Sequence, residues 1–307
     1  MAGHELHWNA QALWGSLEPL LPGLSVEVVA RTASTNSALL ERARIGSAGH
    51  AEDGAPFGRR AADLQPCLLV AEHQTGGRGR FGKSWQSAPG VSLTFSLSLP
   101  LASTDWSGLS LAIGVALAQA LDAGTGARAI GIKWPNDLWL MDAPAANPEP
   151  ADARVGRKLG GILVEAVNVG AHRLAVIGVG LNVLPLDDGA EAVSSGMASL
   201  HELDPQASAP SALAQVALPL AQALRRFEQE GFAAFADGYA QRDLLLGRRV
   251  QTTLAATPEG IARGVTAQGA LRLQTPHGMA TIASGEVSVR MAGVPTSPTS
   301  PTSPTPC

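Results

Sequence analysis

The stretch GRGRFGKSWQSAPGVSLTFSLSL, residues 77–99, decides between two classes of fold. Residues 77–84 satisfy both the phosphate-binding pattern G-x-x-x-x-G-K-[ST] and the dinucleotide pattern G-x-G-x-x-G. Both patterns need a helix directly after the loop, because the amides of its first turn bind the phosphates. Here Pro89 and Gly90 break any helix, and alternating apolar residues from Val91 to Leu99 predict a strand. The loop therefore joins two strands, and neither nucleotide-binding motif is present.

Hydrophobic periodicity predicts an alternation of strands and helices on both sides of this loop. Short runs rich in Val, Ile and Leu indicate strands, and longer runs with helical spacing indicate helices. Strands are predicted at 24–32, 67–72, 91–99, 129–134, 138–141, 158–167 and 173–183, and helices at 8–21, 34–45, 107–123 and within 209–239.

Composition bounds the class of protein. The chain has 307 residues, a formal net charge of −4 and a pI near 6.0, so no broad basic surface for nucleic acid is expected. Its two cysteines fit neither a metal site nor a disulfide framework, which suits a reducing cytoplasm. The N-terminus lacks the pattern of a signal peptide, and the apolar run at 109–121 is too short to span a bilayer. We therefore expect a cytoplasmic globular protein.

Changes in residue composition and in hydrophobic pattern along the chain predict its domain organisation. A helical extension is expected at 1–24 and a large domain at 25–245, with polar or Ala/Pro-rich insertions at about 46–65 and 143–156. Short strands and turns at 246–292 predict a small β domain, and the repeated Pro, Thr and Ser of 293–307 predict a disordered tail.

Five motifs, in this order along the chain, together resemble the biotin–protein ligases. They are STN at 34–36, AEHQTGGRGRFGKSW at 71–85, KWPNDLWL at 133–140, KLGGILVE at 158–165 and GVGLNV at 178–183. The resemblance covers roughly residues 28–290. It implies an α+β fold, in which a class II synthetase-like, mixed or antiparallel sheet is flanked by helices and followed by an SH3-like β-barrel domain.

The resemblance also implies an activity, biotin–[biotin carboxyl-carrier protein] ligation. Biotin and ATP, with Mg2+, would give biotinyl-5′-AMP, and the biotinyl group would pass to a lysine of a carboxylase carrier domain. The chain is expected to act as a monomer or homodimer, with no membrane or DNA partner. Relatives that bind DNA carry a winged-helix domain before the catalytic core, whereas only about 24 residues precede the first predicted strand here, so we expect a monofunctional ligase.

Positive charge is the main chemical requirement, because a carboxylate must approach a polyphosphate. Lys133, at the end of a predicted strand, is the expected catalytic residue, acting on the biotin carboxylate and the α-phosphate. Arg78 and Arg80 are expected to bind biotin and the adenylate, with Arg80 also catalytic, on a loop that closes over the intermediate. Gly79 would lie against biotin, and Lys83 would contact ATP phosphates or lie on the surface. Phe81 stands where many relatives have Arg, which removes one possible phosphate contact.

Neutral residues complete the predicted site. The ureido ring of biotin would be bound by Ser34, Thr35, Asn36 and Gln74, with the backbone at Gly160 and Gly161 forming the pocket wall. Asn182 and Trp85 would contact the adenylate, and Asp137 is a candidate Mg2+ ligand. Several of these residues have a purely structural alternative: Ser34 as a helix N-cap, the glycine pair as a bulge, Trp85 in the core and Asp137 in a turn.

Two other functions remain open from the sequence. A lipoate–protein ligase would share the fold and the adenylate chemistry, although its glycine-rich loop differs from GRGRFGKSW. An inactive homologue that binds biotin or a carrier domain is the second. No residue of the sequence identifies a base for the incoming lysine.

Overall fold

The computed structural model describes residues 6–48, 64–123, 128–141, 156–185, 196–283 and 290–291. The two predicted insertions lie almost entirely outside the described residues, and the predicted Pro/Thr/Ser tail lies wholly outside them. No helix in these ranges is long and apolar enough to cross a membrane.

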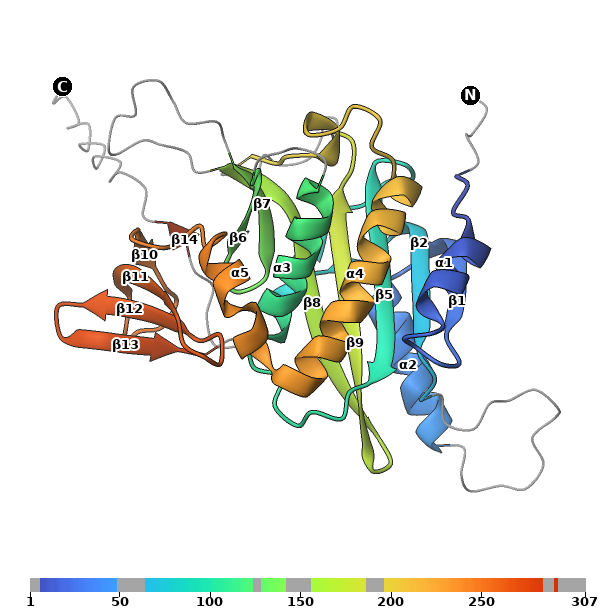
Figure 1. Ribbon diagram of the computed structural model, residues 1–307, viewed down its shortest axis with the longest axis horizontal. Helices are drawn as coiled ribbons and strands as arrows, with labels where there is room; N and C mark the ends of the chain where they lie inside the picture. Colours follow the sequence, from blue (N-terminus) through green and yellow to red (C-terminus); the bar gives the residue numbers. More distant parts are fainter. Residues whose placement is uncertain are drawn as a thin grey trace, which may run out of the picture.

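A seven-stranded sheet forms the centre of the larger domain (Figure 1). Strands β1 and β2, which lie next to each other at one edge, are parallel, since the chain between them crosses over through a helix; every other neighbouring pair is antiparallel. In spatial order the strands are β1 (Ser25–Thr32), β2 (Cys67–Gln74), β5 (Ser92–Pro100), β9 (His172–Asn182), β8 (Gly156–Val169), β7 (Asp137–Met141) and β6 (Ile130–Lys133).

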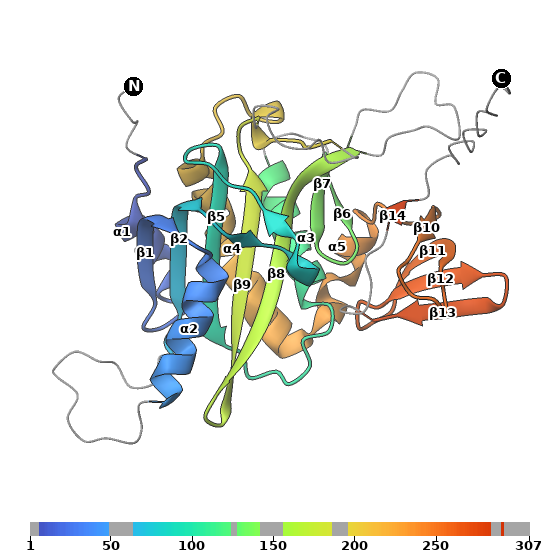
Figure 2. The same cartoon turned by 180° about the vertical axis from the view of Figure 1, so that it is seen from behind.

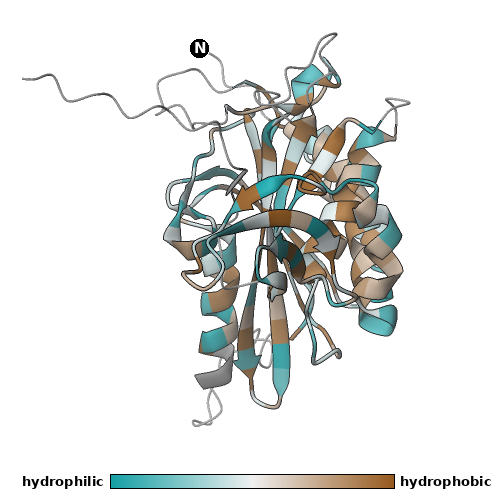
Figure 3. Ribbon diagram, turned by 90° about the vertical axis from the view of Figure 1, so that its left-hand side faces the viewer, coloured by the Kyte–Doolittle hydropathy of each residue, from teal (hydrophilic) through white to brown (hydrophobic). Residues whose placement is uncertain are grey.

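Helices α3 (Leu109–Asp122) and α4 (Ala209–Glu230) cover one face of the sheet (Figure 1). Helix α3 is buried on nearly all sides, because it lies between the sheet and α4; this explains why its sequence is apolar almost throughout. Apolar strand residues and these helices form the main core. Figure 3 shows the apolar residues along these strands and helices. Helix α1 (Ala10–Leu17) packs near β1 and α4.

The opposite face is covered by α2 (Thr35–Ala48) and by a small hairpin of β3 (Gly77–Arg78) and β4 (Ser84–Trp85) (Figure 2). A short 3-10 turn, η2 (Arg80–Gly82), joins the two hairpin strands. The glycine-rich stretch, predicted as a loop, forms this hairpin, and the strand predicted after it is β5 of the main sheet. Because of this cover, the polar positions of β5 are buried as well as its apolar ones: Ser92, Thr94, Ser96 and Ser98 are each at most 4% exposed.

The last strands form a separate five-stranded antiparallel sheet, in the order β13-β12-β11-β10-β14 (Figure 1). This small β domain follows η4 (Phe232–Phe235) and α5 (Ala236–Ala240), and the turn η3 (Leu200–Glu202) lies before α4. Its strands are β10 (Arg249–Gln251), β11 (Glu259–Val265), β12 (Leu271–Thr275), β13 (Gly278–Ile282) and β14 (Arg290–Met291).

Candidate functional site

The predicted site residues are brought to the sheet face that α2 and the β3–β4 hairpin cover (Figure 2). They come from the start of α2, the end of β2, the hairpin, the β6–β7 turn and the glycine-rich parts of β8 and β9. Residues separated by more than 100 positions in the sequence thus share one region.

Neutral polar side chains form a connected network at the start of α2. The side chain of Gln74 accepts hydrogen bonds from the backbone amide of Thr35 (2.7 Å) and from its hydroxyl (3.1 Å). The hydroxyl of Ser96 lies 2.6 Å from Thr35 Oγ1 and 2.5 Å from Asn36 Oδ1. Ser34 also behaves as an N-cap, since its hydroxyl accepts from the amide of Ser37 at 3.4 Å. This network offers both donors and acceptors within one buried region.

Glycines of β9 let the hairpin and α2 approach the sheet closely. A Cβ atom on Gly178 would lie 2.4 Å from Asn36 Oδ1, and one on Gly180 would lie 2.5 Å from the ring of Trp85. Trp85 therefore packs flat against the backbone of β9, and its buried indole Nε1 has no hydrogen-bond partner among the described residues.

The two glycines of the predicted pocket wall face in different directions. A Cβ on Gly161 would lie 3.5 Å from Asp137 Oδ1 and 3.7 Å from Lys158 Nζ, so Gly161 faces the site. One on Gly160 would meet Leu181 and the carbonyl of Gly180, so Gly160 packs within the sheet. The pairing of β7 with β8 shifts its register beside Gly160, between Leu138 and Trp139, which is compatible with the bulge alternative.

Two cations lie close to Asp137, and a third, Lys133, begins from the strand position opposite it. Lys158 Nζ lies 2.9 Å from Asp137 Oδ1 and 5.8 Å from the centre of the Trp85 ring. Arg80 donates to Asn136 Oδ1 at 3.4 Å, and burial lowers the pKa of its guanidinium while the charge of Asp137 opposes this shift. The backbone of Lys133 lies opposite that of Asp137 in the β6–β7 register, and the ammonium of Lys133 lies 4.6 Å from the centre of the Trp139 ring. The turn between β6 and β7 is thus where positive charge converges.

The other hairpin residues differ in their surroundings. Arg78 forms a salt bridge with Glu165, at 3.2 Å from its Nη2. The amide of Gly79 closes the hairpin by donating to the carbonyl of Lys83 at 2.7 Å. Lys83 is exposed, and Phe81 is 60% exposed with a left-handed backbone (φ 56°).

Asn182 is 2% exposed, and its amide nitrogen donates to the carbonyls of Lys158 (3.3 Å) and Ala198 (3.0 Å). These bonds fix the segment at 196–198 beside β8 and β9. A role of Asn182 at adenine would therefore use the side-chain oxygen, and it stays a prediction.

Sequence reasoning assigned no role to three residues that the structure adds to this region. Lys158 and Glu165 both lie inside the KLGGILVE motif, which was read for its glycines alone. Their charge within an apolar strand was the available signal. Ser96 belongs to the polar face of the alternating strand β5, where only burial reveals its contacts with Thr35 and Asn36.

The acidic residues of this region bear on whether a magnesium ion could bind here. Within the described ranges no group of three or more His, Cys, Asp or Glu residues could hold a metal ion. Asp137 can supply one carboxylate, which is how Mg2+ commonly binds when nucleotide phosphates supply the other oxygens. It would have to release Lys158 to do so.

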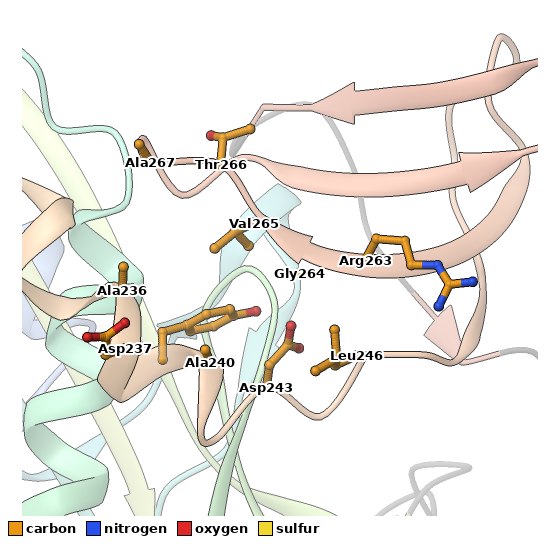
Figure 4. Close-up of a pocket in the computed structure, with 11 residues that line it drawn as sticks. Ala236, Asp237, Ala240, Asp243, Leu246, Arg263, Gly264, Val265, Thr266 and Ala267 are labelled. Carbon is orange, nitrogen blue, oxygen red and sulfur yellow. The ribbon is translucent and has the colours of Figure 1, made fainter.

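Two hollows lie outside the group of cations. One, of about 360 Å³, is lined by α2 residues together with Arg78 and Glu165. The other, of about 260 Å³, lies between α5 and β11 and includes Asp237, Asp243, Val265 and Thr266 (Figure 4).

The mixed sheet, the glycine-rich hairpin and the small β domain define a ligase of the biotin and lipoate type. The model of the biotin/lipoate A/B protein ligase family matches residues 63–182, and that of the biotin protein ligase C-terminal domain matches residues 245–290. The chain belongs to the biotin protein ligase family.

Relatives and solved structures agree with this assignment. The bifunctional ligase/repressor BirA of Escherichia coli is 32% identical over 288 residues, which span 92% of this chain and 78% of BirA. The biotin–[acetyl-CoA-carboxylase] ligase of Mycobacterium tuberculosis is 32% identical over 272 residues, 85% of this chain and 88% of that protein. The structure of the Aquifex aeolicus biotin protein ligase with biotin and ATP has a TM-score of 0.66 at 24% identity, covering 88% of this chain and all of that one; it shows that the folds agree.

Proposed function

We propose that this chain joins the carboxylate of biotin to AMP, with release of pyrophosphate, and then transfers biotin to a lysine of a carboxylase carrier domain. Family membership supports the reaction class. The observation that carries the proposal is the approach of Arg80 and Lys158 to the β6–β7 turn, at the end of the strand that carries Lys133. The neutral network of Thr35, Asn36 and Gln74 lies on the same face of the sheet. The cationic region would bind the carboxylate of biotin and the triphosphate, and the neutral network would bind the uncharged ring of biotin.

The neutral network fits the ureido ring of biotin. The ring has one carbonyl and two N–H groups, so it needs both donors and acceptors. Thr35 and Ser96 carry hydroxyl donors, while Gln74 Oε1 and Asn36 Oδ1 are acceptors. Ser34 and the backbone at Gly79 and Gly161 would form the adjoining wall.

Positive charge would promote the first step. The carboxylate oxygen of biotin attacks the α-phosphorus of ATP, a P–O bond forms, and the bond to pyrophosphate breaks. Lys133 and Lys158 would reduce the repulsion between the two anions, and Arg80 would stabilise the charge that develops on the phosphate oxygens. The incomplete hydration of Arg80, reflected in its lowered pKa, strengthens its attraction for an anion.

Other residues would hold the nucleotide. Trp85 lies on Gly180, and the ammonium of Lys158 lies over its ring at 5.8 Å from the centre, so the indole can shield the adenylate from water. Asn182 would accept from adenine, Lys83 would contact the outer phosphates, and Asp137 would contribute to Mg2+ binding. The hairpin that carries Arg80 would close over the intermediate, with Phe81 at its exposed tip.

In the second step the amine of the carrier lysine attacks the acyl carbon of biotinyl-AMP, an amide bond forms and AMP leaves. We further propose a biotin carboxyl carrier domain as the partner, a cytoplasmic location, and no DNA partner. The chain would work as a monomer or homodimer.

Transfer of labelled biotin to a carboxylase carrier domain, in the presence of ATP and Mg2+, tests the proposal. Pyrophosphate release with biotin, and label on the carrier lysine, are expected. Release with lipoate alone would identify a lipoate ligase, and no release with either acid would identify an inactive homologue. Omission of Mg2+ should abolish turnover if Asp137 and the phosphates share that ion.

A further inference from the structure

One carboxylate connects the hairpin to the predicted biotin residues. Both carboxylate oxygens of Glu165, on β8, lie 3.2 Å from Nη2 of Arg78, on β3. Its Oε2 also accepts from the side-chain nitrogen of Asn36 at 2.9 Å. Three elements, β3, α2 and β8, are therefore held together at this residue.

The two arginines of the hairpin have different partners. Arg78 is paired with Glu165, whereas Arg80 lies beside Asn136 and Asp137 at the β6–β7 turn. The charge of Arg78 is already balanced by a carboxylate, so it adds little to the group of cations that would face ATP. Its partly exposed position suits a fixed attachment at the base of the hairpin.

The same carboxylate determines how the amide of Asn36 is turned. The nitrogen of that amide faces two acceptors, Glu165 Oε2 and the carbonyl of Leu163. Its oxygen is consequently directed to Ser96 and to the neutral network. Without an acceptor at residue 165, the amide would lose its stronger, charge-assisted bond.

We propose that Glu165 is a positioning residue with two tasks: it anchors the base of the hairpin through Arg78, and it orients Asn36 toward biotin. The moving part of the hairpin then begins after Arg78, at Gly79. This inference rests on the proposed function for the role of Asn36 only; the anchor is a property of the ligand-free protein.

Limited trypsin digestion of the full, ligand-free chain tests the anchor. Cleavage after Arg80 and Lys83 is quantified by mass spectrometry for the wild type, Glu165→Gln, Arg78→Gln and the double variant. We expect each single variant to be cut about fivefold faster, since the ion pair is lost, and the double variant to be cut no faster than either. Glu27→Gln is the matched control, because it removes a comparable pair with Arg42 elsewhere on α2. Unchanged cleavage in Glu165→Gln, or additive effects in the double variant, would overturn the anchor.

Biotin binding by calorimetry tests the second task. Gln at position 165 still offers an oxygen to Asn36, whereas Ala does not. We therefore expect Glu165→Ala to bind biotin roughly tenfold more weakly than Glu165→Gln. Equal affinities would refute the orienting role. If the wild type itself binds no biotin, the proposed function fails, while the digestion still decides the anchor.

Discussion

Lys158 and Lys133 reach the β6–β7 turn from two different strands, and their surroundings differ. Lys158 is paired with Asp137 beside Trp85, whereas Lys133 is held over the ring of Trp139. The ion pair places Lys158 among the other groups proposed to face ATP. We infer that both lysines contribute to adenylation, with Lys158 closer to the reacting phosphate.

Lys158→Ala should lower the rate of biotin-dependent pyrophosphate release by about 100-fold, because a charge that stabilises the transition state is removed. Lys133→Ala should lower it less, yet measurably, and both variants should retain weakened biotin binding. Arg226→Ala, which changes an exposed cation on α4, serves as the control. A wild-type rate in Lys133→Ala would remove that residue from the mechanism.

Arg80 is the residue on which retention of the intermediate would depend. Arg80→Gly should release biotinyl-AMP from the site, and the free mixed anhydride acylates nearby lysines at random. Labelling of added bystander proteins with biotin, detected by mass spectrometry, should therefore increase, while Arg80→Lys should show a smaller increase. Labelling confined to the carrier lysine would argue against a hairpin that encloses the intermediate.

At the scale of residues, the sequence predicted which side chains the fold brings to one face of the sheet, but not their pairings; their roles stay predictions. Arg80, Lys133, Thr35, Asn36 and Gln74 lie in the region expected of them. Lys158 was missed because its approach to Asp137 depends on the register of β7 with β8, which shifts between Leu138 and Trp139. Such a shift follows from tertiary packing, and periodicity alone cannot locate it.

Among the elements, β9 is distinctive because two glycines on one face receive side chains from α2 and from the hairpin. Gly178 lies under Asn36 and Gly180 under Trp85. A methyl group at either position would push these side chains off the sheet. The GVGLNV motif is therefore explained by close approach as well as by any contact with ligand.

Gly180→Ala should displace Trp85 and lower both biotin-dependent pyrophosphate release and the stability of the hairpin. We expect a loss of about 1–3 kcal/mol in the free energy of unfolding, measured in urea, from overpacking. Gly15→Ala is the control: a Cβ there meets nothing within 4 Å, and Ala favours the helix. If Trp85 fluorescence and activity were unchanged in Gly180→Ala, the close contact would not matter.

Most longer elements agree with their sequence signals, since each has several periods of apolar residues. The sheet strands and α3 lie where alternation or helical spacing predicted them. The strands β3 and β4 have two residues each, which is too short for any period to appear. Their pairing instead follows from the packing of Gly77 and Trp85 against β2 and β9.

For the molecule as a whole, two titratable side chains, Asp243 and Tyr239, lie near the contact between the two domains. Burial raises the pKa of Asp243, and it raises that of the neighbouring phenol of Tyr239, which is 1% exposed. The folded state thus favours the protonated carboxyl. As the pH rises from about 4 through the raised pKa, the folded state binds more protons than the unfolded one and loses stability.

Asp243→Asn should remove this loss, because the amide does not ionise and can still accept from the amide of Leu245. At pH 7–8 the melting temperature should rise by roughly 2–4 °C, and the gain should vanish near pH 4. Asp237→Asn, on the exposed rim of the same hollow, is the control. A gain that did not depend on pH would point to packing instead of ionisation.

The indole of Trp134, next to Lys133 in the chain, donates to the carbonyl of Gly269 at 3.0 Å, and the turn that holds Gly269 lies against Gly108 at the start of α3. The C-terminal β domain thus holds the end of the strand that carries Lys133 in position. Removing that domain would expose the large apolar indole to water and replace this hydrogen bond by one to solvent, and Lys133 would lose its fixed support. If Lys133 acts as proposed, its position consequently depends on a part of the chain that need not touch biotin or ATP at all.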